Sequence, residues 1–161
     1  MSDSADRERR QLRRAVEAVL RDEVGAVAVQ QVCARCGGSD HGRPRVRVRD
    51  GRPPYVSWSY APGCAAVAWT WAGDVGIDLE AAGPDVAGVG PREAWTRAEA
   101  VLKATGEGLA RSPHDVTEDD VWTLRLPLSP AYVGHVAVAG GRHAAPPAVS
   151  WRLVGPGAPF R

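Results

Sequence analysis

Short strand-like runs, separated by turns rich in glycine and proline, fill most of this 161-residue chain, and only two segments have helical periodicity. Residues 7–22 place apolar side chains at helical spacing with arginines on the other faces, which predicts an amphipathic helix. Residues 95–106 predict a second helix that ends near Gly106. Because helices and strands occur in mixed order, we expect an α+β fold with mostly antiparallel sheets. Strands are predicted at 27–32, 45–49, 75–80, in two runs within 55–71 that turn at Pro62-Gly63, and within 119–128, 131–140 and 148–154.

The composition indicates one folded domain over residues 1–161, with approximate halves 1–74 and 75–161. A formal net charge of +1 gives no general attraction to nucleic acid or to anionic membranes. The first residues are charged where a secretory signal would need an apolar core, and the longest apolar run is too short to span a bilayer. We therefore expect a cytoplasmic monomer with neither a nucleic-acid nor a membrane partner.

Lys103 is the single lysine beside 19 arginines. Arginine keeps its proton in proteins, whereas the pKa of a lysine can be tuned until the ammonium group gives its proton up. The lone lysine is therefore a candidate for proton chemistry. A leftover lysine on a solvated helix face is the other explanation.

Asp78 and Glu80 are two positions apart in the run VGIDLE. On a strand both carboxylates project from one face, while Val75, Ile77 and Leu79 project from the other. Paired carboxylates are suitable ligands for Mg²⁺, which prefers oxygen. Two unrelated acids on a solvated strand face would give the same pattern.

Glu99 and Lys103 are four residues apart in the predicted helix and so lie on one stripe of it. Such a pair is also the commonest surface pair of helices. It becomes a candidate site only if the helix packs Glu99 against Asp78 and Glu80, which would add a third oxygen ligand and bring Lys103 one turn away.

Four blocks in a fixed order carry a resemblance to a known family. They are CARCGGSDHGRPRV, VSWSYAPGCAAVAW, VGIDLE and WTRAEAVLKATGEGL, and they lie within residues 12–154. Together they resemble the signature of 4′-phosphopantetheinyl transferases of the broad-specificity, surfactin-synthetase-activating type. The resemblance implies two similar α+β halves related by a pseudo-twofold, with coenzyme A in the cleft between them.

The resemblance also implies an activity and a set of site residues. Such an enzyme transfers the phosphopantetheine arm of coenzyme A to a serine of an acyl or peptidyl carrier protein of secondary-metabolite biosynthesis, and releases 3′,5′-ADP. Asp78, Glu80 and Glu99 would hold Mg²⁺, Glu99 would help to deprotonate the serine, and Lys103 would stabilise or protonate the leaving phosphate. The positions that would contact coenzyme A are Arg43, Ser59 and Tyr60.

Two departures from the family pattern favour an alternative. Tyr60 stands where the family has a histidine, and only residues 81–94 separate VGIDLE from the second helix, where the family has a longer spacer. The alternative is a divergent member that binds a carrier protein or a biosynthetic intermediate without transfer, or that does different chemistry in the old cleft.

Cys33, Cys36 and His41 form a further cluster of potential ligands. These residue types could bind zinc. The chain has no second closely spaced cysteine pair, so the sequence by itself favours an ordinary turn.

Overall fold

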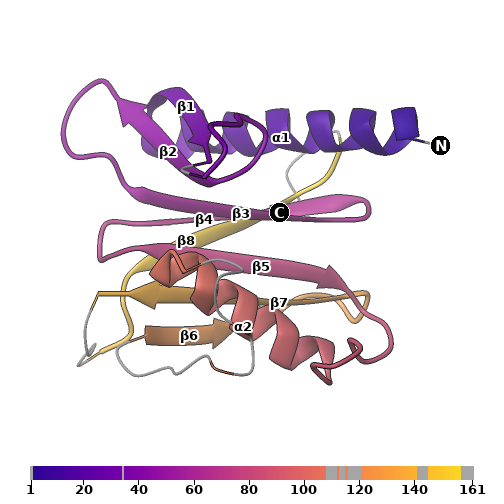
Figure 1. Cartoon of the computed structure of the whole chain (residues 1–161). Coiled ribbons are helices and arrows are strands. Elements are labelled where there is room, and N and C mark those ends of the chain that lie inside the picture. Colours follow the sequence, from indigo (N-terminus) through magenta and orange to yellow (C-terminus); the bar gives the residue numbers. More distant parts are fainter. Residues whose placement is uncertain are drawn as a thin grey trace.

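The computed structural model describes residues 2–33, 35–107, 112, 115, 121–140 and 145–156. These residues form two helices and eight strands, arranged in three small sheets in which every strand pairing is antiparallel (Figure 1). The predicted α+β class is confirmed. In the described part of the chain, no helix has the apolar length that a membrane crossing would need.

The first layer consists of helix α1 (Ser2–Val24) and a hairpin of β1 (Ala26–Val32) and β2 (Arg43–Val48). Leu12, Val16 and Leu20 of α1 are fully or almost fully buried, as the apolar periodicity predicted. The helix begins earlier than the predicted residue 7. Its first turns have no apolar stripe to reveal them, and an ion pair between Arg7 and Asp3 at 3.0 Å supports them instead.

The second layer is a sheet in the order β3-β4-β8, formed by β3 (Tyr55–Ala61), β4 (Cys64–Thr70) and β8 (Val149–Val154). Strand β4 is buried along its whole length. Its side chains alternate: Ala65, Val67 and Trp69 pack in the core beneath α1, whereas Ala66 and Ala68 pack in a second core with the next sheet. A strand with two apolar faces can therefore join two cores.

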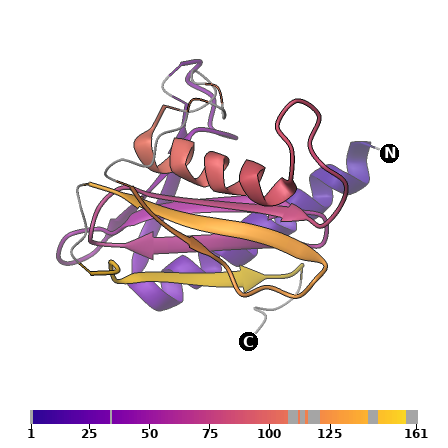
Figure 2. The same cartoon turned by 90° about the horizontal axis from the view of Figure 1, so that it is seen from below.

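The third layer is a sheet in the order β5-β7-β6, formed by β5 (Val75–Ala81), β7 (Tyr132–Ala139) and β6 (Val121–Arg125). Helix α2 (Arg92–Thr105) packs against β5 and β7 and covers the outer face of this sheet (Figure 2). Val75, Ile77 and Leu79 enter the core between the sheets. Asp78 and Glu80 therefore project to the α2 side, as the alternation predicted.

Helix α2 begins at Arg92, directly after Pro91, rather than at the predicted Trp95. Residues 81–94 read as a loop because of their glycine and proline content, but proline is compatible with a helix start, where its missing N–H is not needed. The helix ends as predicted, with Gly106 in the left-handed conformation at φ 78°.

The three tryptophans in and beside β3 and β4 divide into two groups. Trp58 and Trp69 are buried, but Trp71 is 48% exposed. Trp71 lies beyond the last residue of β4, and its indole N–H donates to the carbonyl of Arg52 at 3.0 Å. Trp71 therefore lies outside the core, because strand β4 ends one residue before it.

Candidate functional site

Gly76 sets the distance between strand β5 and helix α2. A Cβ atom at this position would lie 2.0 Å from the carbonyl oxygen of Ala100 and 2.8 Å from Cβ of Lys103. Only a residue without a side chain allows this contact. Gly76 is on the same face of β5 as Asp78, so the close approach brings the helix down onto the acidic face of the strand.

Asp78 is the centre of the resulting cluster and is only 5% exposed. Its Oδ1 atom accepts hydrogen bonds from Nζ of Lys103 at 2.6 Å and from Oγ of Ser59 at 3.0 Å. Lys103 also donates to the carbonyl of Ile77 at 3.0 Å. Strand β3 supplies Ser59 and helix α2 supplies Lys103, so residues predicted from three separate segments meet at one carboxylate.

Two carboxylate oxygens in this region are buried and have no hydrogen-bond partner among the described residues. They are Oδ2 of Asp78 and Oε1 of Glu99. Burial is the main cause that raises the pKa of Glu99, and the negative charge of Asp78 raises it further, while the ammonium group of Lys103 acts in the opposite direction. A buried oxygen without a donor is costly. Each of these oxygens is consequently open to a cation or a proton.

Glu80 lies on the same strand face but has a different partner. Its Oε2 forms an ion pair with Nη1 of Arg92 at 3.4 Å, at the start of α2. The ligand atoms of Asp78, Glu80 and Glu99 do not all come within 4.8 Å of one another; within the described ranges, only Cys33, Cys36 and His41 form a ligand group of three or more that is so compact.

Arg43, predicted to contact coenzyme A, is used within the protein. Its guanidinium donates to Oδ1 of Asp74 at 2.5 Å and to the carbonyls of Lys103 and Ala104 at 2.6 and 2.9 Å. These carbonyls are at the C-terminal end of α2, where a cation is favoured. Arg43 also lines a pocket of about 380 Å³ that contains two further arginines, Arg45 and Arg52.

Tyr60, which stands where the resembling family has histidine, is half-buried under α1. The guanidinium carbon of Arg9 lies 4.7 Å from the centre of its ring, a distance typical of a cation–π contact. Burial raises the pKa of the Tyr60 phenol, and the charge of Arg9 opposes this. A positive group is therefore present beside Tyr60 although the side chain itself is neutral.

His135 is a site residue that the sequence did not single out. It is 4% exposed, lies opposite Asp78 in the β5–β7 register, and its Nδ1 is 2.9 Å from Oγ1 of Thr96 on α2. Burial is the main cause that lowers the pKa of its imidazole, which favours the neutral form. The sequence did contain a signal for this residue, because His135 is the one charged or titratable side chain within the otherwise apolar run 133–139.

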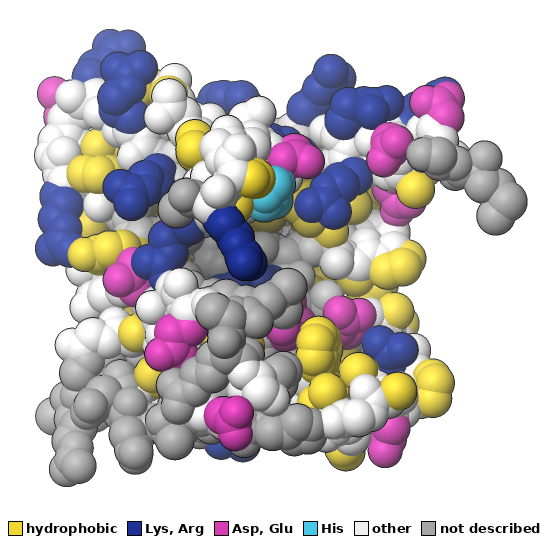
Figure 3. Space-filling model, viewed as in Figure 1, with side chains coloured by type: hydrophobic (Ala, Val, Ile, Leu, Met, Phe, Trp, Pro, Cys, Tyr) yellow, Lys and Arg dark blue, Asp and Glu magenta, His cyan; other side chains and the backbone are white. Residues whose placement is uncertain are grey.

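Charge is unevenly distributed between the two halves. Residues 1–74 carry 12 arginines against 9 acidic residues, whereas residues 75–161 carry 8 basic against 10 acidic residues. In the view of Figure 3, the basic side chains gather over α1, β1 and β2, and the described side chains below them include few basic ones. The arginine-lined pocket thus belongs to the basic half, and the acidic cluster to the other.

The cluster combines three chemical capacities: a buried carboxylate with an open oxygen, a second carboxyl group with a raised pKa, and an ammonium group hydrogen bonded to the first carboxylate. Such a set can bind a cation and can move a proton. Comparisons of the chain with models of protein families, with curated proteins and with solved structures find no match.

Proposed function

We propose that this protein is a 4′-phosphopantetheinyl transferase, which moves the arm of coenzyme A to a serine of a carrier protein and releases 3′,5′-ADP. The observation that carries the proposal is the cluster of Asp78, Glu99 and Lys103. Two buried carboxylate oxygens there have no hydrogen-bond donor in the part of the chain that the structure describes, and the sole lysine lies 2.6 Å from Asp78. The sequence motifs that resemble this family include all three residues.

Two residues of the cluster have an open oxygen that fits a divalent cation. Asp78 and Glu99 would hold Mg²⁺ through their open oxygens, since oxygen ligands suit this ion. Glu80 would join as the third ligand by exchanging its long contact with Arg92. Mg²⁺ would neutralise charge on the pyrophosphate oxygens of coenzyme A.

Side chains of the protein would carry out the proton transfers of the reaction. The carrier serine oxygen attacks the phosphorus that bears the pantetheine arm, and the bond from that phosphorus to 3′,5′-ADP breaks. Glu99, whose pKa is raised by burial, would take the serine proton, directly or through a water molecule. Lys103 would stabilise or protonate the departing phosphate, which an arginine could do only by charge.

Coenzyme A would lie between two halves of the molecule. The two three-stranded sheets each have a helix on the outer face, α1 on one and α2 on the other, and this repetition supports the proposed pseudo-twofold. The arginine-lined pocket near Arg43, with the Arg9–Tyr60 pair, offers positive charge for the phosphates.

Three observations favour the alternative, a relative that no longer transfers the arm. Arg43 is already bonded to Asp74 and to α2, Glu80 is paired with Arg92, and the loop between β5 and α2 contains only residues 82–91. Such a protein would bind a carrier protein or an intermediate without transfer, or do different chemistry at the same cluster.

The deciding experiment incubates the protein with Mg²⁺, coenzyme A and a panel of apo carrier proteins, and reads the added arm by intact mass. Transfer should be lost in Lys103→Ala and Glu99→Gln and be retained in Glu93→Gln, an exposed acid on the same helix. Absence of transfer to every carrier, together with absence of coenzyme A binding by calorimetry, would favour the alternative.

A further inference from the structure

We propose that the segment joining β1 to β2 is a zinc site whose protein ligands are Cys33, Cys36 and His41. The proposal is independent of phosphopantetheine transfer, because the segment lies outside the Asp78 cluster. One ligand atom from each of the three residues lies within 4.8 Å of the others.

The histidine is oriented as a zinc ligand would be. Nδ1 of His41 lies 2.7 Å from Oδ1 of Asp40, and Nε2 lies 3.1 Å from Sγ of Cys36. An ionised carboxylate can only accept a hydrogen bond, so the Asp40 contact places the ring proton on Nδ1 and leaves the lone pair of Nε2 directed at the sulfur. A carboxylate behind the imidazole is the usual second partner of a zinc-bound histidine.

The backbone folds around the two cysteines. The carbonyl of Cys33 accepts from the N–H of Gly37 at 2.8 Å, and the N–H of Cys33 donates to the carbonyl of Gly38 at 2.9 Å. The N–H of Gly38 also donates to Sγ of Cys36 at 3.4 Å. Gly42 has φ +98°, and a Cβ there would lie 2.7 Å from the backbone nitrogen of Cys33. The loop therefore closes on itself and returns His41 to the cysteine pair.

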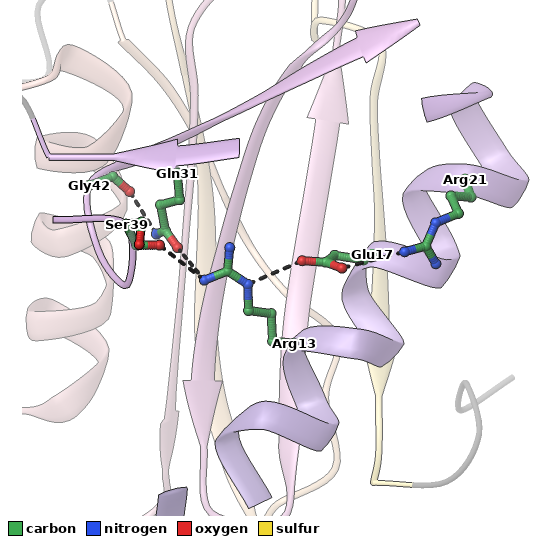
Figure 4. Close-up of polar contacts among 6 residues, drawn as sticks. All are labelled: Arg13, Glu17, Arg21, Gln31, Ser39 and Gly42. Atoms are coloured by element: carbon green, nitrogen blue, oxygen red, sulfur yellow. Dashed lines mark hydrogen bonds and ion pairs between the residues drawn. The ribbon is translucent and has the colours of Figure 1, made fainter. Parts of the chain in front are cut away.

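Polar contacts also fasten this loop to β1 and α1 (Figure 4). Gln31 donates to the carbonyl of Gly42 at 2.8 Å, and Arg13 donates to the carbonyl of Ser39 at 3.3 Å. The ion pair of Arg13 with Glu17, at 3.1 Å, fixes the arginine in turn. The ligand set is thus supported by contacts that do not need the metal, which reduces the ordering cost of binding it.

The donor chemistry favours zinc over a simple disulfide. Two thiolates and one imidazole are a soft, mixed set that suits Zn²⁺, and the inward Nε2 of His41 would have no role beside a disulfide. Binding releases the two thiol protons and leaves one coordination position for water. Arg43, the first residue of β2, follows His41 by two residues and donates to the carbonyl of Lys103 near the end of α2. A bound metal would therefore also fix the start of β2.

The test is titration of the reduced, metal-free protein with Co²⁺ as a spectroscopic substitute, followed by competition with Zn²⁺. One equivalent should produce thiolate-to-cobalt charge transfer together with the intense visible bands of a tetrahedral site, and Zn²⁺ should remove both. Cys33→Ser, Cys36→Ser and His41→Asn should abolish the charge transfer or change its intensity, and Asp40→Asn should weaken the affinity about 10- to 100-fold.

The matched control is Cys64→Ala, which removes the buried thiol on β4, remote in sequence from this loop, and should leave the spectrum unchanged. Far-ultraviolet circular dichroism checks that each variant is folded, and elemental analysis of protein purified from zinc-supplemented medium gives a second measure. Three results would overturn the proposal. They are the absence of charge transfer in the folded wild type, an equal loss of charge transfer in Cys64→Ala, and the absence of zinc from reduced protein purified from the supplemented medium.

Discussion

Asp78 is almost fully buried, yet only one of its two carboxylate oxygens is hydrogen bonded within the described residues. A carboxylate in such a place needs compensation, and Lys103 with Ser59 provides it on Oδ1. The other oxygen has none. Asp78 therefore contributes to stability through its bonded side and offers its open side for binding.

Removal of the Lys103 side chain should show how far the stability of the protein depends on the Lys103–Asp78 contact. Lys103→Ala leaves Asp78 with Ser59 as its remaining side-chain partner among the described residues, and the free energy of unfolding should fall by about 1–3 kcal/mol. In an Asp78→Asn background, the same Lys103→Ala change should cost less. The difference between the two costs should be about 0.5–3 kcal/mol, as is usual for groups in contact. Urea denaturation of the two single variants and the double variant measures the coupling. If the losses of the two single variants simply add up in the double variant, Asp78 and Lys103 do not interact.

Glu99 should make stability depend on pH in a defined direction. Its pKa is raised in the folded state above the value of about 4.3 in an unfolded chain. The stability that this group contributes is therefore complete below that value and is lost as pH rises through the folded pKa. Glu99→Gln cannot ionise and should escape the loss.

The prediction is that Glu99→Gln gains stability relative to wild type as pH rises, and that the gain levels off above the folded pKa. Chemical denaturation at a series of pH values checks it, with the exposed Glu93→Gln as the control. A difference between Glu99→Gln and wild type that does not vary with pH would show that Glu99 is not perturbed by its surroundings.

At the scale of elements, the close contact between β5 and α2 decides whether the cluster forms. Gly76→Ala would force a methyl group to within 2.0 Å of the Ala100 carbonyl, and the helix would have to move away. Overpacking of this kind typically costs about 1–3 kcal/mol. Because Lys103 reaches Asp78 from the displaced helix, any activity of the cluster should fall more than the stability loss explains.

Gly83→Ala is the control for Gly76→Ala. A Cβ at Gly83 would meet the guanidinium end of the Arg92 side chain at 3.1 Å, which can move aside. Its stability by urea denaturation should remain close to that of the wild type. Equal effects of the two substitutions would mean that the β5–α2 contact is not the critical one.

Arg43 joins two elements that are far apart in sequence, β2 and α2. Arg43→Ala should lower the free energy of unfolding by about 1–2 kcal/mol, because it removes charged hydrogen bonds to Asp74 and to the last turn of the helix. Arg45→Ala, an exposed position on the same strand, should have little effect. If Arg43 served only to bind coenzyme A, Arg43→Ala would leave the stability of the free protein unchanged, and thermal unfolding distinguishes the two cases.

The elements themselves could be read from the sequence because each has a regular pattern. The period of two in residues 75–80 predicted which side chains of β5 face inward, and the spacing of Glu99 and Lys103 placed both on one stripe of α2. The partners of Arg43 could not be predicted, since 31 and 60 residues separate it from Asp74 and Lys103. The role of Gly76 was equally hidden, because a glycine in a strand gives no sign of which element lies against it.

The whole molecule is held together by the core between its two three-stranded sheets. Helix α1 and helix α2 lie outside, and the chain crosses back at its end, where β8 pairs with β4 rather than with its sequence neighbours. Residues 149–154 therefore complete a sheet that begins in the first half. The halves are consequently not independent in structure, even though each has its own helix.

This arrangement predicts that a cavity in the shared core weakens both sheets together. Ile77 is completely buried between them, and Ile77→Ala should lower the free energy of unfolding by about 2–5 kcal/mol. Val27→Ala on β1, where the side chain is 48% exposed, is the control and should change it by no more than about 0.5 kcal/mol.

Hydrogen exchange followed by mass spectrometry separates a shared core from two separate ones. In Ile77→Ala, amide protection should fall by a similar factor in β4 and in β7, because neither sheet retains its packing surface when the other opens. Separate units would respond differently: β7 would lose protection while β4 kept that of the wild type. That outcome would mean that the α1 core stabilises the first sheet on its own.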